Sequence, residues 1–273
     1  MGKPSKIRTF TEKENSILVK CLNLIQKGNF IQFLIHSIIQ ILTKNKIDYY
    51  DCNFDEIVSL GYNCEISQRF CDIFKNKVFE HYLYTWSYEK DRSLFLKSFD
   101  MLNDFANSGY NIVPSGMIRH ERSGIDFHSR FKKNDLIDAN LIYTEKYYEA
   151  LAELKSRLNY VALKTENLFK ENKKVLFVMK MKYKNLYEDV KFVEKLSNII
   201  NNKYNQDTCQ FSIIVVLSKR NYPKEELKKI LSKKINHVYF ESVDHFANDK
   251  YTDITGDIVG WHRILRKYIK ENC

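Results

Sequence analysis

The residues best suited to covalent chemistry are a cysteine and a histidine. Cys64 ends the phrase 56–64 (EIVSLGYNC), in which an apolar run leads into Gly61 and a helix-like segment, 65–74, follows. A thiol at that position would face the unpaired amides and the positive dipole end of the helix, and both favour the thiolate. Because the thiolate is the nucleophilic form, the pattern predicts a nucleophile at Cys64. The alternative is a small side chain that merely fits a strand-to-helix turn.

His128 is the best candidate to move a proton for that thiol. It lies in 124–131 (GIDFHSRF), a polar stretch of a region predicted to be rich in loops, 107–131. A neutral imidazole suits proton transfer near pH 7, so we expect His128 to act as general acid and base. His120 is the competing candidate, and a surface or structural role is the alternative for either histidine.

The backbone before the cysteine supplies the next part of the predicted site. Gly61, Tyr62 and Asn63 form the turn, and we expect their amides, with that of Leu60, to stabilise an oxyanion or to bind a phosphate of the substrate. The turn holds a single glycine, so neither a P-loop nor a GxGxxG dinucleotide loop is indicated. No bound cofactor is predicted.

Two other residues are expected near the site. Trp86, in the aromatic segment 78–88, is predicted to pack against the sheet or to line the pocket. Asp257 lies where a loop enters the last predicted helix, and it either caps that helix or, like His262, contacts substrate. The six cysteines form no CxxC pair and no Cys/His zinc pattern. The sequence therefore predicts no metal site, and reduced thiols typical of the cytoplasm.

Alternating strands and helices must position these residues. After residues 55–60, a first strand, and the predicted helices 65–75, 93–106 and 144–170, apolar runs at 174–179, 211–217 and 237–242 alternate with amphipathic segments at 186–204, 225–233 and 258–270. Near-continuous apolar strands between amphipathic helices are typical of a parallel sheet covered on both faces. We therefore predict an α/β fold with a Rossmann-like, mostly parallel sheet. Ligands bind beyond the carboxyl ends of such strands, which is where the turn before Cys64 falls.

The pattern divides the 273 residues into a basic, apolar helical extension, 1–50, and an α/β domain, 51–273. Residues 11–44 are predicted to form helices that pack on the main domain or on a protein partner, with peripheral binding to a membrane surface as the alternative. They are too short, and too interrupted by polar residues, to span a bilayer.

The net charge of +10 is carried outside the motif region, since residues 51–154 hold 17 acidic and 12 basic residues. A nucleic-acid-binding protein would concentrate basic residues on its recognition face. Sequence-specific nucleic-acid binding is therefore not expected, and the predicted partner is a small-molecule or glycan substrate.

Four features together resemble a bacterial family of unknown function that is labelled papain-like cysteine peptidase and is often found near surface-polysaccharide genes. They are the phrase IVSLGYNCEISQRF, the aromatic segment with Trp86, the phrase GIDFHSRF and a basic helix before VLFVMK. The resemblance covers roughly residues 55–270 and implies Cys64 as nucleophile with His128 as its partner. The family usually has an acid where this chain has Thr85, and another where it has Ser129, so the group that orients the base stays open.

Three functions follow from these patterns. The first is a cysteine-nucleophile hydrolase or acyl or peptidyl transferase in surface-polysaccharide biosynthesis. The second is a transferase using a nucleotide-sugar or phosphodiester donor, whose phosphates would be held by Lys180, Lys182, Lys219 or Arg220. The third is a non-catalytic binding or docking domain.

Overall fold

The computed structural model describes residues 47–48, 52–61, 65–75, 81–85, 87–88, 91–113, 115–128, 132–137, 142–171, 173–204, 211–247 and 256–270. All of them belong to one compact unit, Ile47–Cys273. Apart from β1, the helical extension predicted for 1–50, with its segment 11–44, lies outside the described residues. No helix within the described ranges has the length and apolar character needed to cross a bilayer.

The elements of this unit, in chain order, are β1 (Ile47–Asp48), β2 (Glu56–Ser59), α3 (Glu65–Ile73), β3 (Phe74–Lys75), β4 (Ser87–Tyr88), α4 (Arg92–Ser98), the 3-10 helix η2 (Phe99–Asp104), β5 (Tyr110–Ile112), β6 (Ile118–His120), β7 (Ile125–Phe127), α5 (Lys133–Leu136), α6 (Glu145–Lys170), β8 (Val175–Met181), α7 (Leu186–Lys203), β9 (Phe211–Ser218), α8 (Lys224–Leu231), β10 (Val238–Val243) and α9 (Ile258–Lys270).

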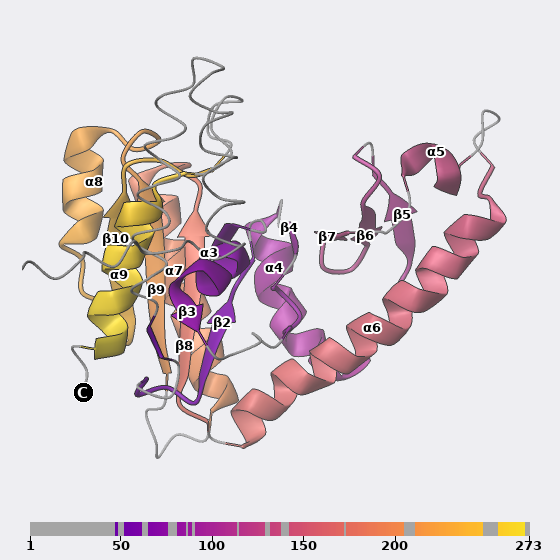
Figure 1. Ribbon diagram of the computed structural model, residues 1–273, viewed down its shortest axis with the longest axis horizontal. Helices are drawn as coiled ribbons and strands as arrows, with labels where there is room; N and C mark the ends of the chain where they lie inside the picture. The colour runs from indigo at the N-terminus through magenta and orange to yellow at the C-terminus, as the bar shows by residue number, and fades with distance from the viewer. Residues whose placement is uncertain are drawn as a thin grey trace, which may run out of the picture. The chain divides into compact units, whose positions relative to one another are not determined.

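Four strands form an all-parallel sheet in the order β10-β9-β8-β2 (Figure 1). Val175 of β8 is level with Glu56 of β2 on one side and with Phe211 of β9 on the other. The predicted α/β fold with a Rossmann-like sheet is therefore confirmed. Since the four strands point the same way, their last residues lie along one edge of the sheet, called the carboxyl edge below.

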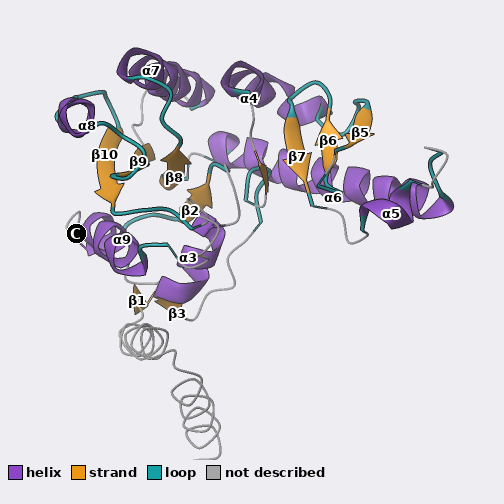
Figure 2. Ribbon diagram, turned by 90° about the horizontal axis from the view of Figure 1, so that it is seen from above, coloured by secondary structure: helices purple, strands orange, loops and turns teal. Residues whose placement is uncertain are grey.

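Helices cover both faces of the parallel sheet (Figure 2). Side chains along a strand alternate between its faces, so Leu176 and Val178 of β8 pack with α3 and α9. Phe177 and Met179 point the other way and pack with α6, α7 and α4. This burial on both faces is why the strands are nearly continuous apolar runs.

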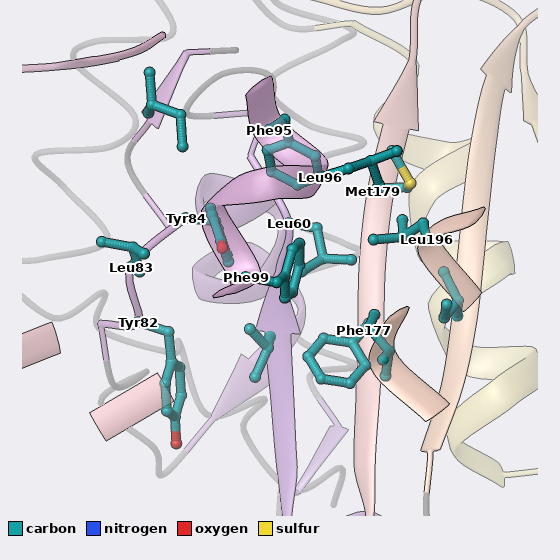
Figure 3. Packing of buried hydrophobic residues seen from close by; sticks show 14 of the residues in the cluster. Leu60, Tyr82, Leu83, Tyr84, Phe95, Leu96, Phe99, Phe177, Met179 and Leu196 are labelled. Atoms are coloured by element: carbon teal, nitrogen blue, oxygen red, sulfur yellow. The ribbon is translucent and has the colours of Figure 1, made fainter. Parts of the chain in front are cut away.

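An aromatic cluster holds segment 81–85 against this sheet. The Tyr84 ring centroid lies 5.1 Å from that of Phe95 and 5.0 Å from that of Phe99. Figure 3 shows these rings beside Phe177 and Met179 of β8. The Tyr84 hydroxyl is hydrogen-bonded to Ser98 Oγ at 2.8 Å, so its one polar atom is satisfied inside the core.

The structure differs from the prediction over residues 107–131, where we expected loops. Three strands of three residues each, β5 to β7, pair with β4 in an antiparallel sheet of order β4-β7-β6-β5. Gly116 (φ 81°) and Gly124 (φ 64°) lie in the two turns of this meander. Such short strands cannot show a convincing two-residue alternation, and their turn glycines mimic an irregular loop.

Candidate functional site

The turn that ends β2 requires its glycine. Gly61 has a φ of 83°, which side-chain-bearing residues rarely adopt, and a Cβ at this position would lie 2.9 Å from Ser87 Oγ. The Leu60 amide donates to the Val178 carbonyl at 2.9 Å, so it continues the sheet ladder. The predicted oxyanion role is therefore wrong for the Leu60 amide. The Gly61 amide faces Ser59 Oγ at 3.4 Å, while Tyr62, Asn63 and Cys64 lie outside the described residues.

Tyr84, Thr85 and Ser87 lie directly against this turn and against the start of α3. Ser67 Oγ of α3 donates to the Thr85 carbonyl at 2.6 Å, and Ser87 Oγ donates to the Tyr84 carbonyl at 2.9 Å. Thr85 stands where the resembled family has an acid. Its Oγ1 accepts from the Tyr82 amide at 2.9 Å, so this side chain holds a turn together. Trp86 lies outside the described residues.

The segment that carries His128 joins the same group of contacts. β4 and β7 pair in antiparallel fashion with Ser87 opposite Phe127, and His128 is the next residue. His128 is exposed, and its carbonyl accepts from Arg157 Nη2 of α6 at 3.1 Å. The three sequence motifs thus meet through a chain of contacts that runs from Gly61 to Ser87 and on to Phe127.

His120, the competing base, is part of the core of the antiparallel sheet. It is fully buried and stacks on Phe105 with 4.1 Å between ring centroids. Its Nε2 lies 2.6 Å from the Phe105 carbonyl, so that nitrogen donates, and Nδ1 accepts from Ser123. Burial lowers the pKa of His120 and keeps the ring neutral. The proposed base role for His120 is therefore wrong, because both ring nitrogens form hydrogen bonds inside the core.

Stability should fall in mild acid because of His120. Its pKa is lowered in the folded state, so below about pH 6.5 the unfolded chain binds the proton more readily. The contribution of the neutral His120 ring to the free energy of unfolding is complete above that pH. It is lost as pH falls, by at most about 1.4 kcal/mol per pH unit. The free energy of unfolding, measured by urea denaturation between pH 5 and 8, should change less with pH for His120→Gln than for the wild type. An equal pH dependence in the two proteins would contradict the assignment of this effect to His120.

The acid nearest to His128 in the described sequence is Asp126, which sequence reasoning did not single out. It is buried, and its two oxygens accept from Arg119 Nε at 2.6 Å and Nη2 at 3.0 Å. This bidentate pair fixes β6 against β7, since Arg119 and Asp126 are cross-strand neighbours. Asp126 therefore stabilises the strand from which His128 projects.

A buried ion pair at the carboxyl edge was also not predicted. Lys180 Nζ, near the end of β8, lies 2.7 Å from Oε2 of Glu65, the first residue of α3, and both side chains are at most 2% exposed. Glu65 Oε1 accepts from the Ala247 amide and the Trp261 indole, each at 3.1 Å. The pair therefore ties α3 to β8, to the loop after β10 and to α9.

Two neighbours show how closely this ion pair is enclosed. A Cβ at Gly256 (φ 61°) would lie 2.6 Å from both Glu65 Oε1 and the Ala247 amide. Lys180 Nζ lies 4.7 Å from the ring centroid of Phe246. The expectation that Lys180 holds a donor phosphate is therefore wrong, because its ammonium is buried against Glu65. Lys219, another of those cations, pairs with Asp244 at 2.7 Å.

Asp257 caps α9. Its Oδ1 accepts from the Gly260 amide at 2.8 Å, and its Oδ2 accepts from the Asp244 amide at 2.8 Å. The capping role predicted for Asp257 is what the contacts show, while a contact with substrate stays a prediction. His262 is buried in α9. Within the described ranges, no cluster of three His, Cys, Asp or Glu side chains could hold a metal ion.

These contacts define an α/β protein with helices on both faces of its parallel sheet and a small antiparallel sheet whose strand β4 lies next to the turn at Gly61. No family model, no curated protein and no solved structure matches the chain. The assignment of function therefore depends on the residues at this edge.

Proposed function

We propose that this protein is a cysteine-nucleophile hydrolase or acyl or peptidyl transferase that acts in surface-polysaccharide biosynthesis. The observation that supports it best is the meeting of three motifs distant in sequence, seen in the contacts of Gly61, Ser87 and Phe127. Cys64 follows the first motif and His128 ends the third. The proposal includes a cytoplasmic location, because the cysteines lack disulfide-like spacing.

The proposed chemistry has two steps. The Cys64 thiolate attacks the carbonyl carbon of an acyl or peptidyl substrate, and the intermediate collapses as His128 gives a proton to the leaving group, which leaves a thioester. His128 then takes a proton from water or from an acceptor hydroxyl or amine, which attacks the thioester and releases the thiolate. Water gives hydrolysis, and an acceptor gives transfer.

Selective alkylation tests the nucleophile. Cys71 is exposed on α3, the same helix that follows Cys64, and so provides a matched internal control. We expect iodoacetamide to modify Cys64 with a pH midpoint at least about one unit below that of Cys71, because a thiol at a helix N-terminus has a lowered pKa. The folded protein would be alkylated between pH 5 and 9. Peptide mass spectrometry after digestion would then give the alkylation rates of Cys64 and Cys71.

The outcome that rejects the nucleophile is an identical pH profile for the two thiols. His128→Gln offers a second measurement. It should raise the midpoint of Cys64 and leave that of Cys71 unchanged if His128 pairs with the Cys64 thiol. A nucleotide or nucleotide-sugar that raises the melting temperature while Cys64 stays inert would instead favour the donor-dependent transferase.

A further inference from the structure

Four basic residues lie on the segments that pack around the antiparallel pair β4–β7. They are His81, His128, Arg157 and Lys164, called the basic cluster below. His81, His128 and Arg157 are exposed, and Lys164 is half-buried. They come from three separate parts of the chain: the segment before β4, the end of β7 and the helix α6.

Direct contacts place these segments side by side. Arg157 Nη2 donates to the His128 carbonyl at 3.1 Å. The Leu83 amide donates to Thr165 Oγ1 of α6 at 3.0 Å, which holds the start of segment 81–88 against the helix. Lys164 Nζ lies 4.9 Å from the ring centroid of Tyr82, the neighbour of His81.

The charges in the basic cluster act on one another. Burial lowers the pKa of His81, and the positive charges of Lys164 and Arg157 lower it further. Lys164 and Arg157 carry positive charge at neutral pH, so both attract an anion that lies between them. Tyr160, one helical turn before Lys164, is 66% exposed and presents a flat ring whose centroid lies 5.9 Å from Lys164 Nζ.

We propose that the basic cluster binds an anionic group of a saccharide substrate, a phosphate or a carboxylate, while Tyr160 contacts the sugar ring. Arginine and lysine donate charge-assisted hydrogen bonds to both groups, and aromatic faces pack against the apolar faces of sugars. The inference rests on the proposed function in one respect, namely that His128 links this cluster to the site of chemistry. It adds the substrate class: an acidic or phosphorylated saccharide.

Titration with three sugars tests the cluster. Glucose 1-phosphate, glucuronate and glucose would be added to the intact protein, with binding measured by calorimetry and the His81 ring followed by NMR. We expect at least one of the two anionic sugars to bind and to raise the pKa of His81, and glucose to bind at least tenfold more weakly. Which anion binds identifies the group. Failure of both anionic sugars to shift His81 would overturn the proposal.

Matched variants locate the binding site. Arg157→Gln/Lys164→Gln should raise the Kd of the anionic sugar at least tenfold. Lys155→Gln/Lys170→Gln removes the same charge from exposed positions of the same helix and should change the Kd less than twofold. Equal losses in the two variants would show a general charge effect and refute the site. Because Arg157 also contacts the backbone, Lys164→Gln alone serves as the variant if the double variant is unstable.

The two proposals fail separately. If Cys64 shows an ordinary alkylation profile while the anionic sugar binds the basic cluster, the catalytic proposal is lost and a saccharide-binding site remains. If Cys64 is reactive and no anionic sugar binds, only the substrate class is lost.

Discussion

Replacing Lys180 with methionine is expected to destabilise the protein by about 3–5 kcal/mol, because a buried charge loses its partner. Glu65 would keep the Ala247 amide and the Trp261 indole as donors but would lose the ammonium that balances its charge. Glu65 and Lys180 join α3, β8 and α9, so we expect the loss to appear as a cooperative decrease in the free energy of unfolding. Urea denaturation of Lys180→Met would measure it.

An exposed ion pair at the same edge of the sheet is the control. Lys219 and Asp244 lie 2.7 Å apart, as close as Lys180 and Glu65, but are 47% and 67% exposed. Solvent screens that pair, so Lys219→Met should cost less than about 1 kcal/mol. The double variant Glu65→Gln/Lys180→Met should recover part of the loss, because no uncompensated charge remains. Equal costs for Lys180→Met and Lys219→Met would refute the importance of the buried pair.

Asp189→Asn should lower the melting temperature by about 10 °C, which corresponds to a loss of about 3–5 kcal/mol in a protein of this size. The Asp189 side chain is fully buried, and its Oδ1 accepts from Arg92 Nη1 at 2.6 Å. Its Oδ2 accepts from the Tyr222 hydroxyl at 2.8 Å. Arg92 Nη2 also donates to the Lys182 carbonyl at 2.6 Å, so the network joins α4 to α7 and to the end of β8.

Graded substitutions separate the charge from the hydrogen bonds. Tyr222→Phe removes one hydrogen bond to Asp189 and should cost about 1–2 kcal/mol. Asp104→Asn breaks a pair with Arg122 in which both side chains are about half exposed, and its effect should be the smallest of the three because solvent screens that pair. Calorimetry should rank the loss of stability as largest for Asp189→Asn, smaller for Tyr222→Phe and smallest for Asp104→Asn. The assigned role of Asp189 would be wrong if its replacement were as mild as that of Asp104.

The parallel sheet could be predicted because its signals are local. Each of β8 and β9 is a run of seven or eight residues with nearly every side chain buried, and an amphipathic helix separates them. The antiparallel sheet could not, because its three-residue strands carry too little pattern. In the folded chain these strands are held by their pairing with one another and by buried side chains such as Ile118, Ile125 and Phe127.

The sequence points to the motifs of the candidate site but not to the pairs that the surrounding residues form. The phrase around Gly61 and the phrase around His128 are both recognisable from residue types. The pair of Glu65 and Lys180 spans 115 residues of sequence, and each partner alone looks ordinary. A glutamate at the start of a helix is favoured by the dipole, so nothing in the sequence marked it as buried.

The order of the sheet has a consequence for folding. Each of the two connections from β8 to β9 and from β9 to β10 is one short helical crossover, whereas Lys174 and Asp55, at the starts of β8 and β2, are 119 residues apart. Closing the longer loop costs about 1 kcal/mol more chain entropy, and contacts of this range form slowly. We expect β8, β9 and β10 to assemble first and β2 to pair with β8 last. The turn at Gly61 would then reach its place only when the rest of the sheet has formed, so nascent or partly folded chains would lack a completed site.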